Sequence, residues 1–136
     1  MILKNLPKDF IWGTATAAHQ VEGNNTNSDF WHLEHTKDTT FAEPSGIACD
    51  QWNRYEEDID IMADHSIQAY RLSVEWARIE TSEGEFSQEA IDHYKKVLDY
   101  CRKKGLKTCV TLQPVSYTHL RAHETEADLV CRLLLE

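Results

Sequence analysis

The sequence lacks several features that define whole classes of proteins. No apolar run approaches the ~20 residues that a membrane-spanning helix needs, and no basic segment followed by an apolar one opens the chain. Positive charge is scarce, because 14 Lys and Arg residues face 23 Asp and Glu residues, for a net charge of -9. This acidic balance disfavours binding to nucleic acids and to anionic membranes, so we expect neither as a partner.

Cysteine pairing and internal repeats are missing too. The four cysteines have no CxxC spacing and no regular framework (Cys49, Cys101, Cys109 and Cys131). We interpret them as free thiols of a reducing compartment, which predicts a cytoplasmic protein. No self-similarity with a period of roughly 20 to 50 residues is present, so repeat architectures are excluded.

Two histidine pairs imitate metal-ligand spacings without completing a site. His32 and His35 lie three residues apart in a polar stretch, and His119 and His123 lie four residues apart near the end of the chain. A structural metal site needs about four converging ligands. We therefore expect no metal and no other cofactor.

The segment FIWGTATAAHQVEG at residues 10–23 organises the rest of the chain. Phe10 and Trp12 are typical of a strand whose side chains reach a core. The small residues that begin at Gly13 allow the backbone to pass close to its neighbours. The segment therefore predicts a buried strand followed by a tight turn.

Three polar side chains follow this predicted strand: His19, Gln20 and Glu22. In a parallel α/β barrel the carboxyl ends of the strands form the face that carries the active site. The amide of Gln20 can donate and accept hydrogen bonds at once, which suits paired sugar hydroxyls. The alternative is that these groups only cap a buried turn.

Residues 50–112 alternate between helix and strand patterns. After a candidate N-cap at Asp50, apolar residues at helical spacing predict a helix that ends near residues 64–66. A strand is predicted at 67–76, a turn around Gly84, a helix capped by Ser87, and a buried strand at 106–112. This order predicts an α/β fold with a parallel sheet and right-handed crossovers. His93 is expected at the solvent edge of the second helix.

Residues 24–48 have the composition of a long loop with one helical turn near Phe30 and Trp31. A loop of this length after a strand is usually functional. The two aromatic rings could wall a sugar site by stacking on pyranose faces. Alternatively, they could pin the loop to the sheet.

Arg71 lies in the strand pattern at 67–76, where Tyr70, Leu72 and Val74 alternate with polar residues. The apolar set should face the outer helices, so Arg71 should point to the other side of the sheet, into a barrel. A buried arginine there needs a carboxylate partner. A purely structural salt bridge would satisfy the same requirement.

The segment at 10–23, together with YRLSVEWARI at 70–79, resembles the N-terminal signatures of glycoside hydrolase family 1, the β-glucosidase family. The resemblance implies an incomplete (β/α)8 TIM barrel, of which residues 1–113 would supply the first three strands and two main helices. A whole barrel of this kind needs about 250 residues.

The resemblance also assigns roles to single residues. In the family, the glutamine at the position of Gln20 hydrogen-bonds the non-reducing sugar. The arginine at the position of Arg71 sits beside the catalytic nucleophile and keeps it ionised, since a nearby cation lowers the pKa of a carboxylate. Glu22 and Trp12 are expected to support the site. Both catalytic glutamates of the family lie on later strands, so this chain is expected to contain no catalytic residue.

Residues 114–136 are expected to be a non-native tail. Pro114 stands where the family has a sugar-binding histidine. Residues 114–125 resemble a translated transposase adapter from sequencing libraries, and residues 129–136 resemble the flow-cell adapter that follows it. Such a scar carries no information on the fold.

The expected function is that of a fragment of a retaining β-glycosidase, β-glucosidase-like, which hydrolyses O-glycosidic bonds of β-linked glycosides or oligosaccharides in carbohydrate metabolism. Retention requires two carboxylates about 5–5.5 Å apart, so the fragment itself is expected to be inactive. The alternative is a non-catalytic carbohydrate-binding protein. Three parallel strands with open edges argue against that alternative, and the paired signatures argue against another glycosidase family.

Overall fold

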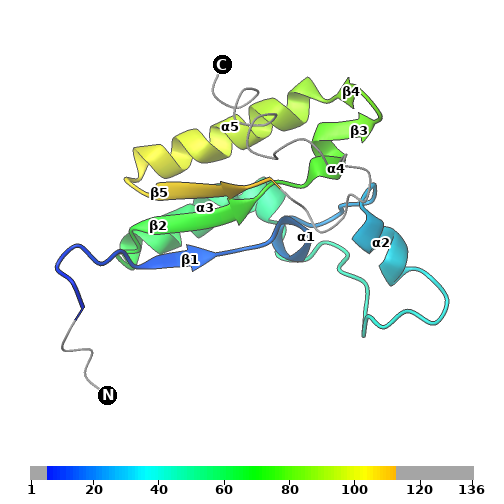
Figure 1. The fold of residues 1–136 in the computed structure, drawn as a ribbon, viewed down its shortest axis with the longest axis horizontal. Coiled ribbons are helices and arrows are strands. Elements are labelled where there is room, and N and C mark those ends of the chain that lie inside the picture. The colour runs from blue at the N-terminus through cyan, green and yellow to red at the C-terminus, as the bar shows by residue number, and fades with distance from the viewer. Residues whose placement is uncertain (1–5, 113–136) are drawn as a thin grey trace.

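The computed structural model of the chain describes residues 6–112. Its centre is a parallel sheet in the order β1 (Gly13–Ala15), β2 (Ala69–Ser73), β5 (Lys107–Thr111) (Figure 1). Gly13 pairs with Ala69, which in turn pairs with Lys107. The predicted tail, residues 114–136, lies outside the described residues.

Two long helices connect these strands and cover one face of the sheet: α3 (Gln51–Asp64) and α5 (Gln88–Lys103) (Figure 1). Alternation in β2 explains the packing, because Tyr70 and Leu72 are buried beneath the helices while Arg71 is exposed on the opposite face. Within residues 6–112 no helix has both the length and the apolar character needed to cross a membrane.

Two clusters of buried side chains form the core between the sheet and these helices. The first gathers at the carboxyl end of β2 and contains Val74, Trp76, Ile79, Ala90, Ile91 and Tyr94. The second lies toward the other end and contains Ile59, Tyr70, Leu72, Val97, Cys101 and Leu106. The apolar side chains that recur at helical spacing in α3 and α5 therefore pack against the apolar side chains that alternate along β2.

Short elements occupy the connections at the carboxyl ends of the strands. Helices α1 (Ala18–Val21) and α2 (Asp29–Glu34) follow β1. Helix α4 (Trp76–Ile79) follows β2 and leads into an antiparallel pair, β3 (Glu80–Ser82) and β4 (Glu85–Phe86). The turn predicted around Gly84 is present between β3 and β4. The strand predicted at 67–76 is too long, because Trp76 already begins α4.

The two predicted helix caps differ in outcome. Ser87 caps α5 as expected, since its Oγ accepts a hydrogen bond from the backbone N–H of Ala90 at 3.2 Å. Asp50 precedes α3 but has a left-handed φ of 53°, and its side chain makes no capping bond to the helix backbone. Its carboxylate accepts a hydrogen bond from the side-chain amide of Asn53 at 2.7 Å instead.

His93, predicted at the solvent edge, is half-buried and also packs against α3. Its ring stacks on Trp52 of α3 with centroids 3.7 Å apart, and the edge of Tyr55 lies nearby. Burial lowers the pKa of His93, and the positive charges of Arg78 and Lys96 act in the same direction. The imidazole thus serves as a flat packing surface between α3 and α5.

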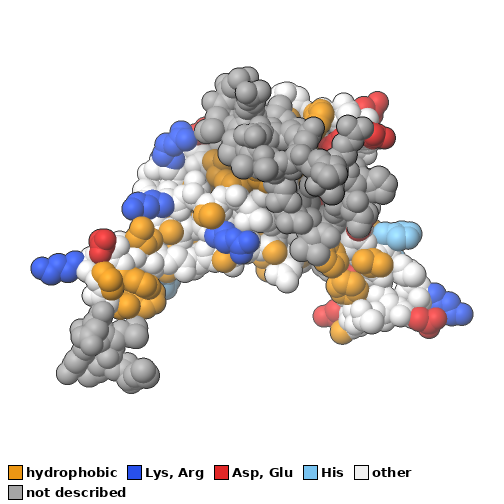
Figure 2. All heavy atoms as spheres, viewed as in Figure 1, with side chains coloured by type: hydrophobic (Ala, Val, Ile, Leu, Met, Phe, Trp, Pro, Cys, Tyr) orange, Lys and Arg blue, Asp and Glu red, His pale blue; other side chains and the backbone are white. Residues whose placement is uncertain are grey.

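The sheet face opposite the helices is open within the described residues, and this overturns two predictions of burial. Phe10 and Trp12, predicted to reach a core, are 42% and 50% exposed, and β1 begins only at Gly13. The first three residues of β5 are exposed as well. Hydrophobic side chains are visible at the end of the sheet near the N-terminal segment (Figure 2). A parallel strand is buried only when layers cover both faces.

We expect the purified 136-residue chain to unfold without a sharp cooperative transition. Within residues 6–112 one sheet face is uncovered and β1 and β5 are both edges of the three-stranded sheet, so much apolar surface and many backbone groups there are left to water. Circular dichroism and calorimetry during heating would measure this. A single steep transition with equal calorimetric and van't Hoff enthalpies would contradict the expectation.

Candidate functional site

The carboxyl ends of β1, β2 and β5 lie at the same edge of the sheet, and α1 packs directly against this edge (Figure 1). Two hydrogen bonds fix the turn between β1 and α1. The backbone N–H of Thr16 donates to the carbonyl of Arg71 at 3.0 Å, and that of Ala18 donates to Oγ of Ser73 at 2.7 Å. Helix α1 therefore starts in a defined position beside the end of β2.

Gln20 lies within α1 and is exposed at this edge. Its backbone N–H donates to the carbonyl of Ala17 at 3.0 Å, which belongs to the first turn of the helix. Both α/β barrels and open α/β sheets bind their ligands at the carboxyl ends of the strands, which is where the amide of Gln20 lies. The location agrees with the predicted sugar contact, which itself stays a prediction.

Arg71 lies in the middle of β2 and projects from the uncovered face, as the alternation predicts. It is exposed rather than buried, and its Nε donates to Oγ1 of Thr111 on β5 at 3.0 Å. The predicted buried position is wrong for residues 6–112, because no layer covers this face within them. The guanidinium is thus held toward the carboxyl end of β5.

Trp12 lies at the opposite end of the sheet from Gln20. Its backbone N–H donates to Oε1 of Gln68 at 3.1 Å, and its carbonyl accepts from the N–H of Gln68 at 2.9 Å. The indole meets Phe10 edge-on with centroids 5.0 Å apart. The structure therefore separates Trp12 from the other predicted site residues and ties it to the start of β2.

Glu22 follows α1 directly and is 5% exposed. Its Oε1 accepts a hydrogen bond from the hydroxyl of Tyr94 at 2.7 Å, and its Oε2 accepts from Nε of Arg78 at 3.1 Å. The same Arg78 also donates to Oδ1 of Asn25 at 2.6 Å and to the carbonyl of Gly23. We call Glu22, Asn25, Glu75, Arg78 and Tyr94 the Glu22 network.

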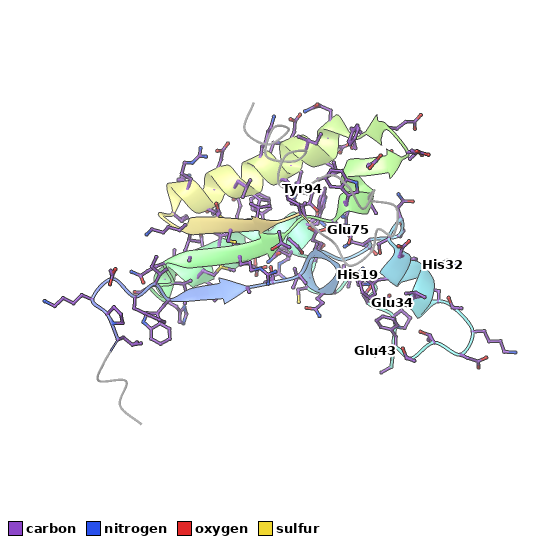
Figure 3. The ribbon with its side chains drawn as sticks, in the orientation of Figure 1. His19, His32, Glu34, Glu43, Glu75 and Tyr94 are labelled. Carbon is purple, nitrogen blue, oxygen red and sulfur yellow. The ribbon has the colours of Figure 1, made fainter. Side chains whose placement is uncertain are left out.

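Glu75 completes the Glu22 network (Figure 3). Its backbone N–H donates to the hydroxyl of Tyr94 at 2.8 Å, so this one hydroxyl accepts from Glu75 and donates to Glu22. Its carboxylate accepts from Nδ2 of Asn25 at 3.5 Å. The network joins the segment after β1 to α4 and α5, which sequence reasoning did not predict.

Burial dominates the electrostatics of this network. Removal from water raises the pKa of Glu22 from 4.5 to about 7, although Tyr94 and Arg78 act against the rise. Burial also raises the pKa of Tyr94 well above its ordinary value, and the carboxylate of Glu22 adds to the effect. The phenol therefore stays a proton donor throughout the neutral range.

A second group of hydrogen bonds joins α1 to the long loop. Nε2 of His19 donates to Oε1 of Glu34 on α2 at 2.6 Å, and Nδ1 of His19 contacts Oγ of Ser28 at 3.2 Å (Figure 3). Glu34 also accepts from the backbone N–H and from Oγ of Ser45, both at 2.9 Å. These bonds outweigh the burial of Glu34 and hold its pKa below the ordinary value.

The aromatic residues of the long loop pack within it. Phe30 lies against the ring of His19 with centroids 5.3 Å apart and against Phe41 at 6.0 Å. Trp31 stacks on His35 at 4.8 Å. These contacts agree with the interpretation that the rings pin the loop, and Phe30 connects it directly to α1.

A polar cavity of about 330 Å³ lies beside the Glu22 network and contains neither Gln20 nor Arg71. Its wall is formed by amides, hydroxyls and charged groups from the loop after α1, from α4 and from the start of α5, namely Asn24, Asn25, Thr26, Asn27, Trp52, Glu75, Ala77, Arg78, Thr81, Ser87, Glu89 and Ala90. Within residues 6–112 no group of three or more His, Cys, Asp or Glu side chains could hold a metal ion.

Comparison with known proteins adds the family. Residues 2–116 match the profile of Glycosyl hydrolase family 1. The chain is 39% identical over 113 residues to β-glucosidase A of Acetivibrio thermocellus, and the alignment covers 78% of this chain and 25% of that protein. It is 40% identical over 116 residues to β-glucosidase 6 of Oryza sativa subsp. japonica, covering 79% of this chain and 22% of that protein.

Solved structures give the same result. The chain resembles the crystal structure of β-glycosidase BGL167 with a TM-score of 0.77 and 59% identity, covering 80% of this chain and 26% of that one. For the family 1 β-glucosidase of Thermotoga maritima the TM-score is 0.76 at 34% identity, with 83% and 27% covered.

The chain thus spans about a quarter of the length of the relatives that it matches. The predicted fold, with three strands and two main helices of a (β/α)8 barrel, is confirmed by these barrel structures. The chain belongs to glycosyl hydrolase family 1.

Proposed function

We propose that this chain forms the first part of the barrel of a β-glucosidase-like enzyme that hydrolyses β-linked O-glycosides, and that the 136 residues alone catalyse no hydrolysis. The observation that carries the proposal is the family match across residues 2–116, whose curated relatives are named β-glucosidases. Gln20 at the carboxyl edge of the sheet agrees with it, because barrel enzymes carry their active sites there.

Two residues have proposed roles at the sugar. The exposed amide of Gln20 would hydrogen-bond the hydroxyls of the non-reducing sugar. Arg71, which Thr111 holds on the uncovered face at 3.0 Å, would lie beside a carboxylate from another strand and keep that carboxylate ionised. Trp12 would support the fold rather than contact the sugar, because its backbone bonds to Gln68 lie at the far end of the sheet.

Neither Glu22 nor Glu75 is proposed as a catalytic group. Retaining hydrolysis requires a nucleophile and an acid/base that both reach the substrate from opposite sides of the scissile bond. Glu22 is engaged by Tyr94 and Arg78, and Glu75 is 1% exposed within the same network. Their positions suit a supporting role behind Gln20.

A chimera tests the activity of the whole barrel. Residues 6–112 of this chain would replace the segment of β-glycosidase BGL167 that they match at 59% identity. We expect the chimera to hydrolyse a chromogenic β-glucoside, whereas the 136-residue chain, purified free of host glycosidases, shows no turnover.

Turnover by the chain alone would refute the proposed inactivity. A chimera that folds but does not hydrolyse any β-glycoside would refute the proposed function. Saturable binding of an oligosaccharide to the chain without turnover would favour the carbohydrate-binding alternative instead.

Residues 114–136 are proposed to be absent from the natural protein. The proposal rests on the adapter-like sequence after Gln113. Amplifying the gene from source DNA and sequencing across codon 113 without adapter ligation tests it. We expect the reading frame to continue with a different sequence, and recovery of the same 23 codons would show that the segment is natural.

A further inference from the structure

Helix α1 contains only four residues, so one turn carries Gln20. A single helical turn has too few internal hydrogen bonds to hold its own shape. Its position must therefore come from contacts with neighbouring elements. At its start, Oγ of Ser73 accepts from the backbone N–H of Ala18 at 2.7 Å.

The end of α1 is held by Glu22, two residues after Gln20. The carbonyl of Glu22 accepts from the backbone N–H of Trp52 at 3.3 Å, which fixes the backbone to the start of α3. The side chain accepts from Tyr94 on α5 and from Arg78 on α4. The three helices α3, α4 and α5 thus all donate hydrogen bonds to Glu22.

Close packing leaves this segment little room to shift. A Cβ atom at Gly23 would lie 2.1 Å from the carbonyl oxygen of Ile47, and the φ of Gly23 is +84°. Arg78 also donates to the carbonyl of Gly23 and to Oδ1 of Asn25. The guanidinium that binds the Glu22 side chain therefore also holds the segment after Glu22, through the backbone of Gly23 and the side chain of Asn25.

We propose that Tyr94 and Arg78 are positioning residues: by holding the carboxylate of Glu22 they fix α1, and through α1 they orient the amide of Gln20. The inference rests on the proposed function in one respect, namely that Gln20 contacts the sugar. Tyr94 reaches neither Gln20 nor the exposed edge itself, since it is 3% exposed in the core under α5. Its influence on substrate would pass through Glu22.

A double-mutant cycle in the chimera tests this path. We expect Tyr94→Phe to lower kcat/KM by about tenfold when Gln20 is present, and by less than about twofold in the Gln20→Ala background. A residue that only stabilises the fold would cause the same loss in both backgrounds. Equal losses would therefore overturn the proposal.

Tyr100→Phe is the matched control, because it removes the same hydroxyl from the same helix. Tyr100 donates to Asp60 of α3 at 3.0 Å, away from α1. We expect it to change kcat/KM by less than about twofold in either background. Arg78→Lys, which keeps the charge but loses the branched donor group, should couple to Gln20 as Tyr94→Phe does.

Hydrogen exchange gives a readout that does not depend on turnover. The backbone N–H of Glu22 donates to the carbonyl of Ala18 at 2.9 Å within α1. In the chimera, Tyr94→Phe should speed exchange of this amide by about tenfold or more, while Tyr100→Phe leaves it unchanged. An unchanged exchange rate of the Glu22 amide in Tyr94→Phe would overturn the positioning role. If this rate rises as expected but the chimera hydrolyses no β-glucoside, only the glycosidase proposal is overturned.

Discussion

Gln20→Ala in the chimera is expected to lower kcat/KM for a β-glucoside by roughly 30- to 160-fold. The change removes an amide that is exposed at the carboxyl edge of the sheet and that can form two hydrogen bonds to sugar hydroxyls. Each bond in a dry site contributes about 1 to 1.5 kcal/mol, so the loss of both costs about 2 to 3 kcal/mol of transition-state binding. Steady-state kinetics on a chromogenic glucoside would measure the effect.

Gln68→Ala is the matched control for this prediction. Gln68 has the same side chain and is also exposed, but it lies at the opposite end of the sheet and accepts a hydrogen bond from the backbone of Trp12. We expect its loss to change kcat/KM by less than about twofold. Similar losses in both variants would show that Gln20 acts through stability rather than through contact with the sugar.

The main strands and helices could be predicted because their periodicities are strong. The alternation of Tyr70, Leu72 and Val74 with polar residues identifies β2, and the cap at Ser87 identifies the start of α5. Helix α4 was missed, since four residues from Trp76 are too few to show a helical period. Local sequence therefore predicts long elements and misses short ones.

The exposure of Trp12 and of β5 could not be predicted from these patterns. Hydrophobicity indicates that a residue prefers burial, but burial also requires a second layer of structure over it. Within residues 6–112 the helices α3 and α5 cover only one sheet face, so Trp12 stays 50% exposed. The remaining strands of a barrel would supply the missing layer.

The candidate site was predicted in part. Gln20 and Arg71 were identified from the family resemblance, and the structure places Gln20 at the carboxyl edge and Arg71 on the uncovered face. Tyr94 lies within the predicted helix that Ser87 caps, and nothing around it in the sequence indicates a site. Its hydroxyl meets Glu22 across 72 positions of sequence, and no local pattern encodes a contact over that separation. Only the folded chain reveals the Glu22 network.

Two buried carboxylates on either side of α1 should respond to pH in opposite directions. Glu22 and Glu34 are each 5% exposed. Burial raises the pKa of Glu22 from 4.5 to about 7. For Glu34, burial also opposes ionisation, but hydrogen bonds from His19 and Ser45 prevail and lower its pKa. The partners of each group, not its burial alone, decide the sign.

The sign of each effect on stability follows from proton linkage. Folded Glu22 holds its proton more tightly than the unfolded chain does, so its stabilisation is complete below about pH 4.5 and is lost as the pH rises to about 7. At 1.36 kcal/mol for each pKa unit, the loss is about 3 kcal/mol. The stabilisation from Glu34 is present above its unfolded pKa and is lost as the pH falls through the lowered value.

Glu22→Gln and Glu34→Gln in the chimera form the matched pair that measures this difference. Glutamine cannot ionise, so the free energy of unfolding of Glu22→Gln relative to the parent chimera should rise by about 3 kcal/mol between pH 4.5 and 7.5. Glu34→Gln should be less stable than the parent at neutral pH, with a deficit that shrinks only under acidic conditions. Urea unfolding midpoints at a series of pH values would give both curves. A flat curve for Glu22→Gln would mean that Arg78, at 3.1 Å, keeps Glu22 ionised despite its burial. The Glu22 network would then contain a permanent ion pair behind Gln20, and Glu22 would not gain or lose a proton near neutral pH.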